Sequence, residues 1–391
     1  MTPMPPTRAR AACLPLALAA LLLALALALA ACAEDEPTEE ADDDADAEVD
    51  EDAEADEDAE PDDAEDAEAE EPRELTLLTH DSFNVSEDVL ASFTEETGIE
   101  VSVVPSGDAG TALNQAILTK DAPQGDLLFG VDNTFLSRAL DEDLFVPYTS
   151  PRLDDVDEDL ILDDEHRATP IDYGDVCLNY DRAWFDERDV DVPSDLDDLT
   201  DEAYDGLLAV TNPATSSPGL AFLLATIERF GDGEHLAFWE DLSERDVVVT
   251  DGWSEAYYDE FSGTGGGDRP LVVSYASSPP AEVISADPQP DEAPTGVIEE
   301  SCFRQIEHVG ILAGTDAEAE AQELVDFMLD VPFQEDMPLN MFVFPVNERA
   351  ELPEAYLEHT VVPSDPFEID YAEIGEQREE WIDEWTATVL R

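Results

Sequence analysis

Polar and aromatic residues gather in five short segments, each of which adjoins a β-like run of the chain. They are THDSF (79–83), GVDN (130–133), NPATSSPG (212–219), DGWSEAY (251–257) and SYASSP (274–279). Rings, carboxylates and hydroxyl groups in such loops suit the binding of a small polar solute. Trp253 is the most informative residue, because it follows a glycine turn and lies between a strand-like run and a helix start, where α/β folds present ligands. A tryptophan that only packs this loop against the core is the alternative.

Catalytic chemistry has no comparable signal in the sequence. The five histidines are scattered without metal-ligand spacing, and neither a Gly-x-Ser-x-Gly elbow nor a Cys–His pairing pattern is present. We therefore expect no enzyme, no catalytic residue, no metal site and no cofactor. An exported acid hydrolase is the enzymatic alternative, since carboxylates are abundant. A structural surface protein is the other alternative, but such chains usually contain repeats and none is visible here.

The sequence between the loops predicts alternating strands and helices, which would hold the loops in place. Strand-like runs at ELTLLTHDSF (74–83), IEVSVVPSG (99–107) and GDLLFGVDN (125–133) alternate with helical patterns at SEDVLASFTEETG (86–98), where Gly98 is the C-cap, and AGTALNQAILTKDAP (109–123). This order predicts a parallel sheet with ligand-facing loops at the carboxyl ends of its strands. About 320 residues follow position 72, which suits two lobes better than one core. A two-lobed α/β protein without a nucleophile is most simply one that closes on a solute.

The charge of the chain is extreme and narrows the choice of partners. Among 391 residues there are 100 Asp and Glu against 16 Lys and Arg, and Lys120 is the single lysine. Because only 25 of the acids lie in residues 33–72, the rest of the chain is strongly acidic as well. A field of this sign repels phosphate backbones and attracts cations, so we expect no nucleic-acid partner. The arginine bias is typical of a protein kept soluble at high salt, as in an acidic proteome.

The first 72 residues are predicted to target and tether the protein. Residues 1–32 contain two arginines, a long apolar run and the ending LAAC, which resembles a bacterial lipobox and predicts a lipid on Cys32. A transmembrane anchor is the alternative for the apolar run. Residues 33–72 are a low-complexity acidic segment that cannot bury a core, and we expect a disordered tether. The protein is then lipid-anchored on the extracytoplasmic face of the cell membrane.

Two cysteines, Cys177 and Cys302, remain once the signal peptide and the lipidated Cys32 are set aside. An even pair in an oxidising compartment favours a disulfide over two free thiols.

The loops taken together, with PIDYG (170–174), closely resemble the thiamine-binding subunits of bacterial ABC importers, which have the type II periplasmic-binding fold. The resemblance runs in order from residue 75 to the EWIDEW tail. It implies a monomer with two lobes, hinge strands and a central cleft, which captures thiamine, with thiamine phosphates left open, and delivers it to ABC permease subunits. The implied division is a first part of lobe 1 at 73–174, lobe 2 at 175–300, and a return to lobe 1 with a C-terminal helix at 301–391.

The family resemblance also implies which rings meet the ligand. Thiamine carries a permanent thiazolium cation and a flat aminopyrimidine, so its pocket should offer aromatic faces and a carboxylate. Trp253 and Tyr275 are expected to stack on the ligand, with Tyr257 supporting Trp253 one turn on. His80 stands where close relatives often carry Tyr, and Ala281 stands where another relative has an aromatic.

Two helix starts and several strand ends complete the expected site. Asp81 and Ser82 align with the family's Asp-Ser, although Asp81 is equally plausible as a helix N-cap. The TSSPG segment opens a helix whose N–H groups could hold a phosphate or the hydroxyethyl group, unless it is an ordinary cap. Phe342 takes a tryptophan position of relatives, with core as its alternative. The other candidates are Asp132, Asn133, Asp172, Tyr173, Ser216, Ser217, Gly219 and Ser277.

The same resemblance places Cys177 and Cys302 on the two hinge strands, which would bring them within bridging distance. Ferric-ion capture on the same fold is the nearest alternative function, since the adjacent Tyr257 and Tyr258 could be iron ligands. Neither Trp253 nor TSSPG would have a role in an iron site.

Overall fold

The computed structural model describes residues 73–264 and 266–390, so the expected signal segment, Cys32 and the tether lie outside the described residues. The strands are β1 (Arg73–Thr79), β2 (Ile99–Pro105), β3 (Leu127–Asp132), β4 (Phe145–Val146), β5 (Thr169–Asp181), β6 (Leu208–Thr211), β7 (Val248–Thr250), β8 (Leu271–Tyr275), β9 (Thr295–Leu312) and β10 (Phe344–Pro345). The α-helices are α1 (Glu87–Thr97), α2 (Ala109–Leu118), α3 (Leu136–Asp141), α4 (Arg182–Arg188), α5 (Ser217–Phe230), α6 (His235–Glu244), α7 (Ser278–Ile284), α8 (Glu318–Met328), α9 (Val331–Asn340), α10 (Glu354–His359) and α11 (Tyr371–Val389). A π-helix spans Glu255–Glu260.

The strands of the described residues form one ten-stranded sheet. Its order is β2-β1-β3-β9-β5-β8-β6-β7, with β10 paired to β5 and β4 to β9. β1 is parallel to β2 and β3, while β6 is parallel to β7 and β8. β9 runs antiparallel to both β3 and β5. The strands β5 and β9 lie in the middle of the sheet and join the parallel groups at its two ends. Strands and helices alternate over residues 73–132, in the order β1, α1, β2, α2, β3, as predicted.

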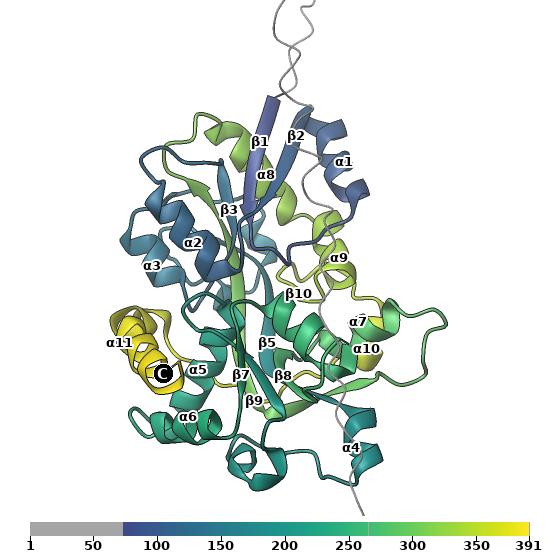
Figure 1. The fold of residues 1–391 in the computed structure, drawn as a ribbon. Coiled ribbons are helices and arrows are strands. Elements are labelled where there is room, and N and C mark those ends of the chain that lie inside the picture. Colours follow the sequence, from purple (N-terminus) through teal and green to yellow (C-terminus); the bar gives the residue numbers. More distant parts are fainter. Residues whose placement is uncertain (1–72, 265, 391) are drawn as a thin grey trace, which may run out of the picture. The chain divides into compact units, whose positions relative to one another are not determined.

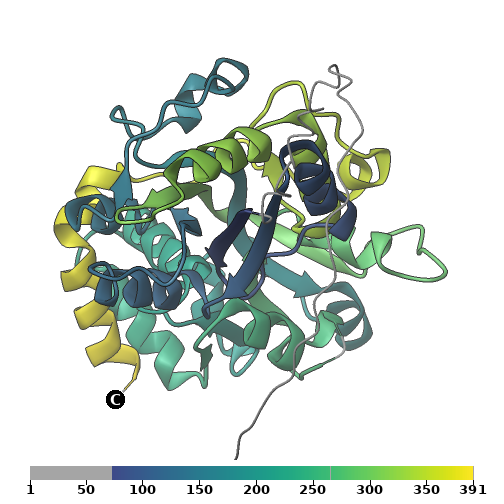
Figure 2. The ribbon, with the colours of Figure 1, turned by 90° about the horizontal axis from the view of Figure 1, so that it is seen from above.

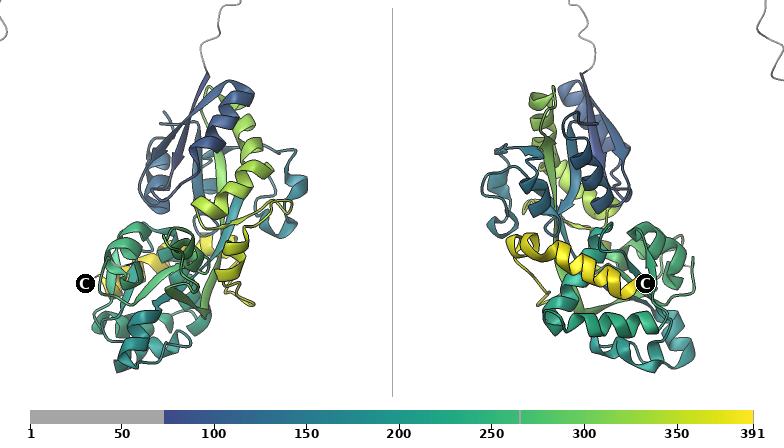
Figure 3. Two further views of the ribbon diagram at one scale, coloured as in Figure 1. Left: turned by 90° about the vertical axis from the view of Figure 1, so that its right-hand side faces the viewer. Right: turned by 60° about the vertical axis from the view of Figure 1, so that its left-hand side comes forward.

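Two lobes are built on the two parallel groups (Figures 1 and 3). We call β1–β3 with α1–α3, α8 and α9 the first lobe, and β6–β8 with α4–α7 the second lobe. The long strands β5 and β9 pass from one lobe to the other and pair over most of their length, from Thr169 opposite Val309 to Asp181 opposite Thr295. The exact residue limits of the lobes stay a prediction.

Local sequence signals explain where the first helices begin and end. Ser86 caps α1 by accepting the Val89 N–H at 3.3 Å, and Gly98 ends the helix in the left-handed region at φ 72°. Asp108 caps α2 in the same way, by accepting the Ala109 N–H at 2.7 Å. These caps fix the lengths of the loops that follow β1 and β2.

The C-terminal helix α11 contacts both lobes. Its Trp385 ring lies 5.5 Å from the Trp239 ring of α6, edge to face, and its Arg378 guanidinium lies 5.3 Å from the ring of Phe135, next to α3. Both tryptophans are fully buried. Seen from above, α11 runs along the side of the fold that lies away from α1 (Figure 2). No helix in residues 73–264 and 266–390 has the length and apolar character needed to cross a membrane.

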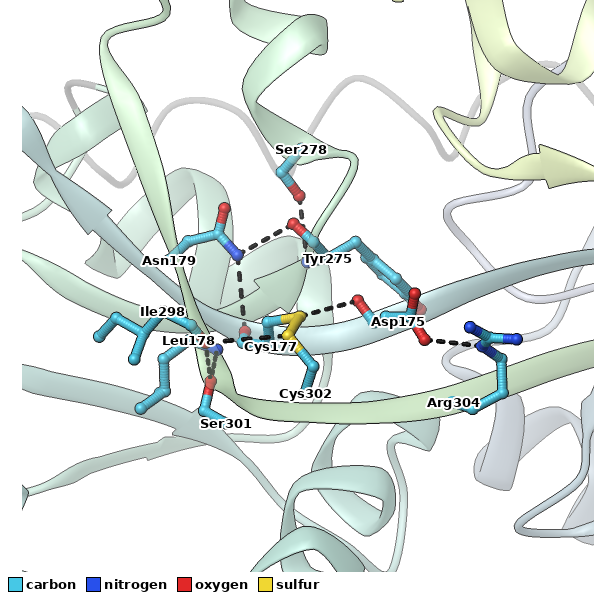
Figure 4. Close-up of a disulfide and its surroundings, with 10 residues drawn as sticks. All are labelled: Asp175, Cys177, Leu178, Asn179, Tyr275, Ser278, Ile298, Ser301, Cys302 and Arg304. Atoms are coloured by element: carbon cyan, nitrogen blue, oxygen red, sulfur yellow. Dashed lines mark hydrogen bonds and ion pairs between the residues drawn. A yellow bond between two sulfur atoms is a disulfide. The ribbon is translucent and has the colours of Figure 1, made fainter. Parts of the chain in front are cut away.

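A disulfide joins the two strands that connect the lobes, as predicted. Cys177 of β5 and Cys302 of β9 are bonded, with their Cα atoms 4.2 Å apart and a sequence separation of 125. Beside the disulfide, the Ser301 hydroxyl accepts the Leu178 N–H at 2.8 Å, where the register of the strand pair shifts (Figure 4). Arg304 and Asp175 form an ion pair at 2.7 Å two residues further along each strand.

Candidate ligand-binding site

A cavity of about 450 Å³ lies between the two lobes. The first lobe contributes the loops after β1 and β2 together with residues 340–343. The second lobe contributes the start of α5, the segment around the π-helix and the end of β8. These are the carboxyl ends of parallel strands and the starts of helices, which is where an α/β fold exposes main-chain polar groups to a ligand.

One wall of the cavity is aromatic. Trp253 lies between β7 and the π-helix, and its ring stacks on Tyr257 with centroids 4.9 Å apart and an interplanar angle of 16°. Tyr258 meets the same indole edge to face at 5.5 Å, and Tyr275 lies 6.3 Å away. The indole Nε1–H donates to the Ser274 hydroxyl at 2.9 Å, which fixes the ring. Trp253 is thus both packed against protein and part of the cavity wall.

Asp108 links the two lobes across the cavity. Its carboxylate accepts the Ala109 N–H of its own lobe at 2.7 Å. It also accepts the Trp253 N–H at 2.9 Å and the Ser217 N–H at 3.3 Å from the second lobe. Burial raises the pKa of Asp108, against the opposing effect of the Trp253 hydrogen bond.

A row of three buried carboxyl groups crosses the strands beneath the cavity. Glu307 of β9 stands opposite Asp132 of β3 on one side and opposite Asp172 of β5 on the other. Glu307 lines the cavity, and its Oε1 lies 3.5 Å from Nε2 of His80. Directly opposed residues of antiparallel strands project to the same face, so the three groups interact with one another.

The protonation states in this row follow from burial and from His80. Burial raises the pKa of Asp132 to about 7, with Glu307 adding to the shift and hydrogen bonds from Ser217 and Thr134 opposing it. Burial, followed by the charge of Glu307, raises the pKa of Asp172 well above its usual range. Burial opposes ionisation of Glu307 too, but the neighbouring His80 lowers the pKa of Glu307 overall. Burial likewise opposes a charge on His80, and Glu307 outweighs it, so the pKa of His80 is raised.

Two tyrosines of the cavity hold their hydroxyl protons more tightly than usual. Tyr257 donates its hydroxyl to Glu282 at 3.1 Å, and burial together with this carboxylate raises its pKa well above the usual value. Burial and Glu282 also raise the pKa of Tyr258. Within the described residues, no three His, Cys, Asp or Glu side chains are placed to share a metal ion.

The sequence-predicted residues divide into two groups by position. Those that line the cavity are His80, Asp81, Ser82, Ser217, Trp253, Tyr257, Tyr275 and Phe342. Those that do not line it are Asp132, Asn133, Asp172, Tyr173, Ser216, Gly219 and Ser277. Ala281, which stands where a relative has an aromatic, also lines the cavity, and Phe342 does so with its backbone at φ 56°. A positive φ is unusual for a bulky residue, and such outliers gather at binding sites.

The residues outside the cavity have structural roles that explain their positions. Asp132 and Asp172 flank Glu307 beneath the site. Asn133 and Tyr173 line a separate hollow that also includes Arg304, and the Asn133 side chain bonds the main chain of Arg304 and Ile306.

The remaining three lie at helix starts. A Cβ on Gly219 would come 2.5 Å from the Thr211 carbonyl oxygen, so this glycine packs α5 against β6. Ser216 and Ser277 are buried just before α5 and α7.

Asp108, Glu307 and Tyr258 are among the lining residues that the sequence prediction missed. Asp108 resembles an ordinary helix cap, and Glu307 is one acid among many in a strand. Tyr258 is 55% exposed at the cavity and supplies a further ring near Trp253. Its only signal was the adjacent pair of tyrosines, which pointed to iron.

The chain belongs to the bacterial extracellular solute-binding proteins, whose family model matches residues 123–363. The thiamine-binding periplasmic protein of Escherichia coli (strain K12) is 28% identical over 321 residues, which cover 81% of this chain and 94% of that protein. The protein of the same name from Brucella abortus biovar 1 (strain 9-941) is 29% identical over 335 residues, with 83% and 94% covered.

Solved structures agree with this assignment. A periplasmic thiamin binding protein has a TM-score of 0.73 at 27% identity, covering 81% of this chain and 96% of that chain. A ferric binding protein from Campylobacter jejuni has a TM-score of 0.66 at 16% identity, covering 80% and 99%, which is a likeness of fold alone. The predicted two-lobed type II fold is confirmed, as is a solute-binding protein that is not an enzyme.

Proposed function

We propose that this protein captures thiamine outside the cytoplasm and delivers it to an ABC importer. The observation that carries the proposal is the pairing of an aromatic wall at Trp253 with buried carboxylates in one cavity between the lobes. A flat cation gains from both, because it can stack on a ring while its charge is balanced by nearby carboxylates. The names of the relatives support the same ligand.

The parts of thiamine can be assigned to parts of the cavity. The thiazolium belongs near Trp253, Tyr258 and Tyr275, whose rings offer faces and edges to a cation. The aminopyrimidine needs groups that donate and accept hydrogen bonds, which Asp81, Ser82 and the His80–Glu307 pair supply. Asp132 and Asp172 flank Glu307 beneath the site, and the charge of Glu307 raises the pKa of both.

The cellular setting is part of the proposal. A lipid on Cys32 and the acidic segment 33–72 would hold the two lobes at the membrane surface, within reach of the permease subunits. We propose that the protein works as a monomer, as one cavity contained in one chain suffices to hold the ligand.

Calorimetry on the purified protein tests the ligand, with Trp253→Ala as the decisive variant. We expect thiamine to bind, and Trp253→Ala to weaken binding by at least ~1 kcal/mol, which is about five-fold, because stacking area and the cation–π interaction are lost. Trp184→Ala is the matched control, since Trp184 lies on α4 and contacts Phe185 and Arg188 rather than the cavity.

Two results would contradict the proposal. One is equal thiamine affinity in Trp253→Ala and the wild type. The other is tight binding of Fe³⁺ with a tyrosinate absorption band, which would favour the ferric alternative.

A further inference from the structure

The row of carboxyl groups beneath the cavity holds more acid than its surroundings can neutralise. Asp132 of β3, Glu307 of β9 and Asp172 of β5 are directly opposed across neighbouring strands, and their exposed fractions are 0%, 5% and 0%. Buried acids are ordinarily paired with bases or held by several hydrogen-bond donors. Within the described residues the row forms a single ion pair, between Glu307 and His80 at 3.5 Å. One base therefore serves three acids.

Hydrogen bonding indicates which member of the row keeps its proton. Neither carboxyl oxygen of Asp172 has a hydrogen-bond partner in the part of the chain that the structure describes, and the residue opposite is Glu307. A buried carboxylate without donors, next to another carboxylate, is strongly destabilised. Asp172 is thus protonated, and Glu307 carries the negative charge that His80 balances. The raised pKa of Asp172, caused by burial and then by Glu307, agrees with this.

Asp132 is the member of the row that is balanced between its two forms. Three hydrogen bonds from Thr134 and Phe135 to one of its oxygens favour the carboxylate. Complete burial and the charge of Glu307 favour the protonated form, and the pKa of Asp132 is raised to about 7. Both forms are populated near neutral pH, so a new charge in the cavity would shift the proton.

Titratable and charged groups face the row from every side. They are His80 and Asp81 after β1, Asp108 before α2, Tyr275 of β8, His308 of β9, Tyr356 of α10 and Arg378 of α11. Burial lowers the pKa of His308 to about 4 and raises the pKa of both tyrosines, so these three are neutral at pH 7. Burial lowers the pKa of Arg378 only to about 10, so it stays charged. His80 and Asp132 are then the groups that can change charge near pH 7.

A cation in the cavity would act on both of these groups in the same direction. His80 and Glu307 line the cavity, and Asp132 stands directly opposite Glu307. The positive charge of a ligand stabilises the carboxylate form of Asp132 and destabilises the charged form of His80. Each change releases a proton. A neutral ligand of the same shape would cause neither.

We propose that the row Asp132–Glu307–Asp172 selects a permanently cationic ring by giving up a proton when the cation enters, so that the full counter-charge forms only around a bound cation. The proton leaves from the Asp132 O–H or the His80 N–H and is taken up by the buffer, and no other bond changes. The proposal rests on thiamine as the ligand, because its thiazolium carries the permanent charge.

Titration calorimetry on the wild-type protein at pH 7, in phosphate and in Tris at equal ionic strength, tests the proposal. The two buffers differ in their heat of protonation, so the difference in binding heat counts the protons released. We expect thiamine to release about half a proton or more, because a group with a pKa of about 7 is half protonated at this pH. By linkage, thiamine affinity should then rise about three-fold per pH unit near pH 7.

The neutral isostere 3-deazathiamine, in which carbon replaces the cationic nitrogen, is the matched ligand. It should release no proton and bind at least about ten-fold more weakly than thiamine. Thiamine binding without proton release, or with proton uptake, would overturn the proposal and leave thiamine as the ligand. Equal release by the two ligands would overturn it as well. Failure of both ligands to bind would refute the proposed function too.

The variant Asp132→Asn tests the source of the proton, because it keeps a carbonyl acceptor and removes the titrating group. It should reduce the number of protons released at pH 7 by at least about half. Asp126→Asn is the matched control, since Asp126 precedes the other end of β3, accepts the Thr76 N–H at 2.8 Å and lies outside the cavity lining. This control should release as many protons as the wild type. Unchanged release in Asp132→Asn, or an equal loss in both variants, would overturn the role given to Asp132.

Discussion

Replacing Asp132 with asparagine should make the protein more stable at pH 8 and leave its stability at pH 4 little changed. Asp132 is fully buried at the end of β3, where one of its carboxylate oxygens accepts the Thr134 N–H at 3.1 Å, the Thr134 hydroxyl at 2.7 Å and the Phe135 N–H at 3.2 Å. An asparagine carbonyl can accept the same three hydrogen bonds. The substitution therefore removes a titrating charge next to Glu307 with little change in packing.

The sign and size follow from proton linkage. Burial, with a contribution from Glu307, raises the pKa of Asp132 to about 7 in the folded protein, from 3.8 in the unfolded chain. The folded state thus holds this proton more tightly, so the stabilisation is complete below pH 3.8 and is lost as the pH rises through about 7. A difference of about three pKa units corresponds to at most ~4 kcal/mol of unfolding free energy.

Urea unfolding of both proteins between pH 4 and pH 8, at high constant salt, measures the effect. The difference in unfolding free energy between Asp132→Asn and the wild type should grow with pH. Asp291→Asn is the control, because Asp291 is exposed in the loop between α7 and β9, and its removal reports only the general benefit of one charge fewer. A difference that stays flat with pH, or that matches the Asp291 control, would refute the assignment of the raised pKa to Asp132.

Three further outcomes can be measured. Replacing Cys177 and Cys302 with serine should lower the unfolding free energy by at most ~5 kcal/mol, because the bridged positions have a sequence separation of 125, and reduction of the wild type should shift the urea midpoint similarly. Tyr257→Phe should keep thiamine affinity within about two-fold, whereas Tyr257→Ala should lower it like Trp253→Ala, because the ring stack and not the hydroxyl supports Trp253. In stopped-flow mixing, the association rate of thiamine should fall as salt rises over the range where the protein stays folded, and a constant rate would exclude electrostatic steering of the cation.

The parts of the site that the sequence predicted are those set by local patterns. Trp253 could be placed because a glycine turn between a strand and a helix is visible in a few residues, and β1 to β3 could be placed from alternating strand and helix patterns. Cys177 and Cys302 could be paired because few cysteines remain once the expected signal segment and Cys32 are set aside, although their positions on the hinge strands depended on family resemblance.

The parts that the sequence could not predict depend on contacts between distant residues. The cap residue Asp108 gains its role from N–H groups that lie 109 and 145 residues away. Asp172 and Tyr173 were both expected to face the ligand, but consecutive strand residues project to opposite faces of a sheet. Asp172 meets Glu307 beneath the cavity, while Tyr173 stacks on Phe344 in the other hollow. The register of β5 against β9 decides that Asp172, and not Tyr173, stands opposite Glu307.

Contacts of α11 with both lobes restrict how the cleft can open. This helix has 19 residues and is about 28 Å long. Its Trp385 contacts Trp239 of the second lobe, and its Arg378 contacts Phe135 of the first lobe. Moving α11 away from the first lobe would break the Arg378–Phe135 contact, and moving it away from the second lobe would expose two buried tryptophans to water. Opening the Ser82–Ser254 side breaks only a few hydrogen bonds. We therefore expect the rotation axis with the lowest free-energy cost to pass close to α11. The lobes then open at the Ser82–Ser254 side and stay together along α11.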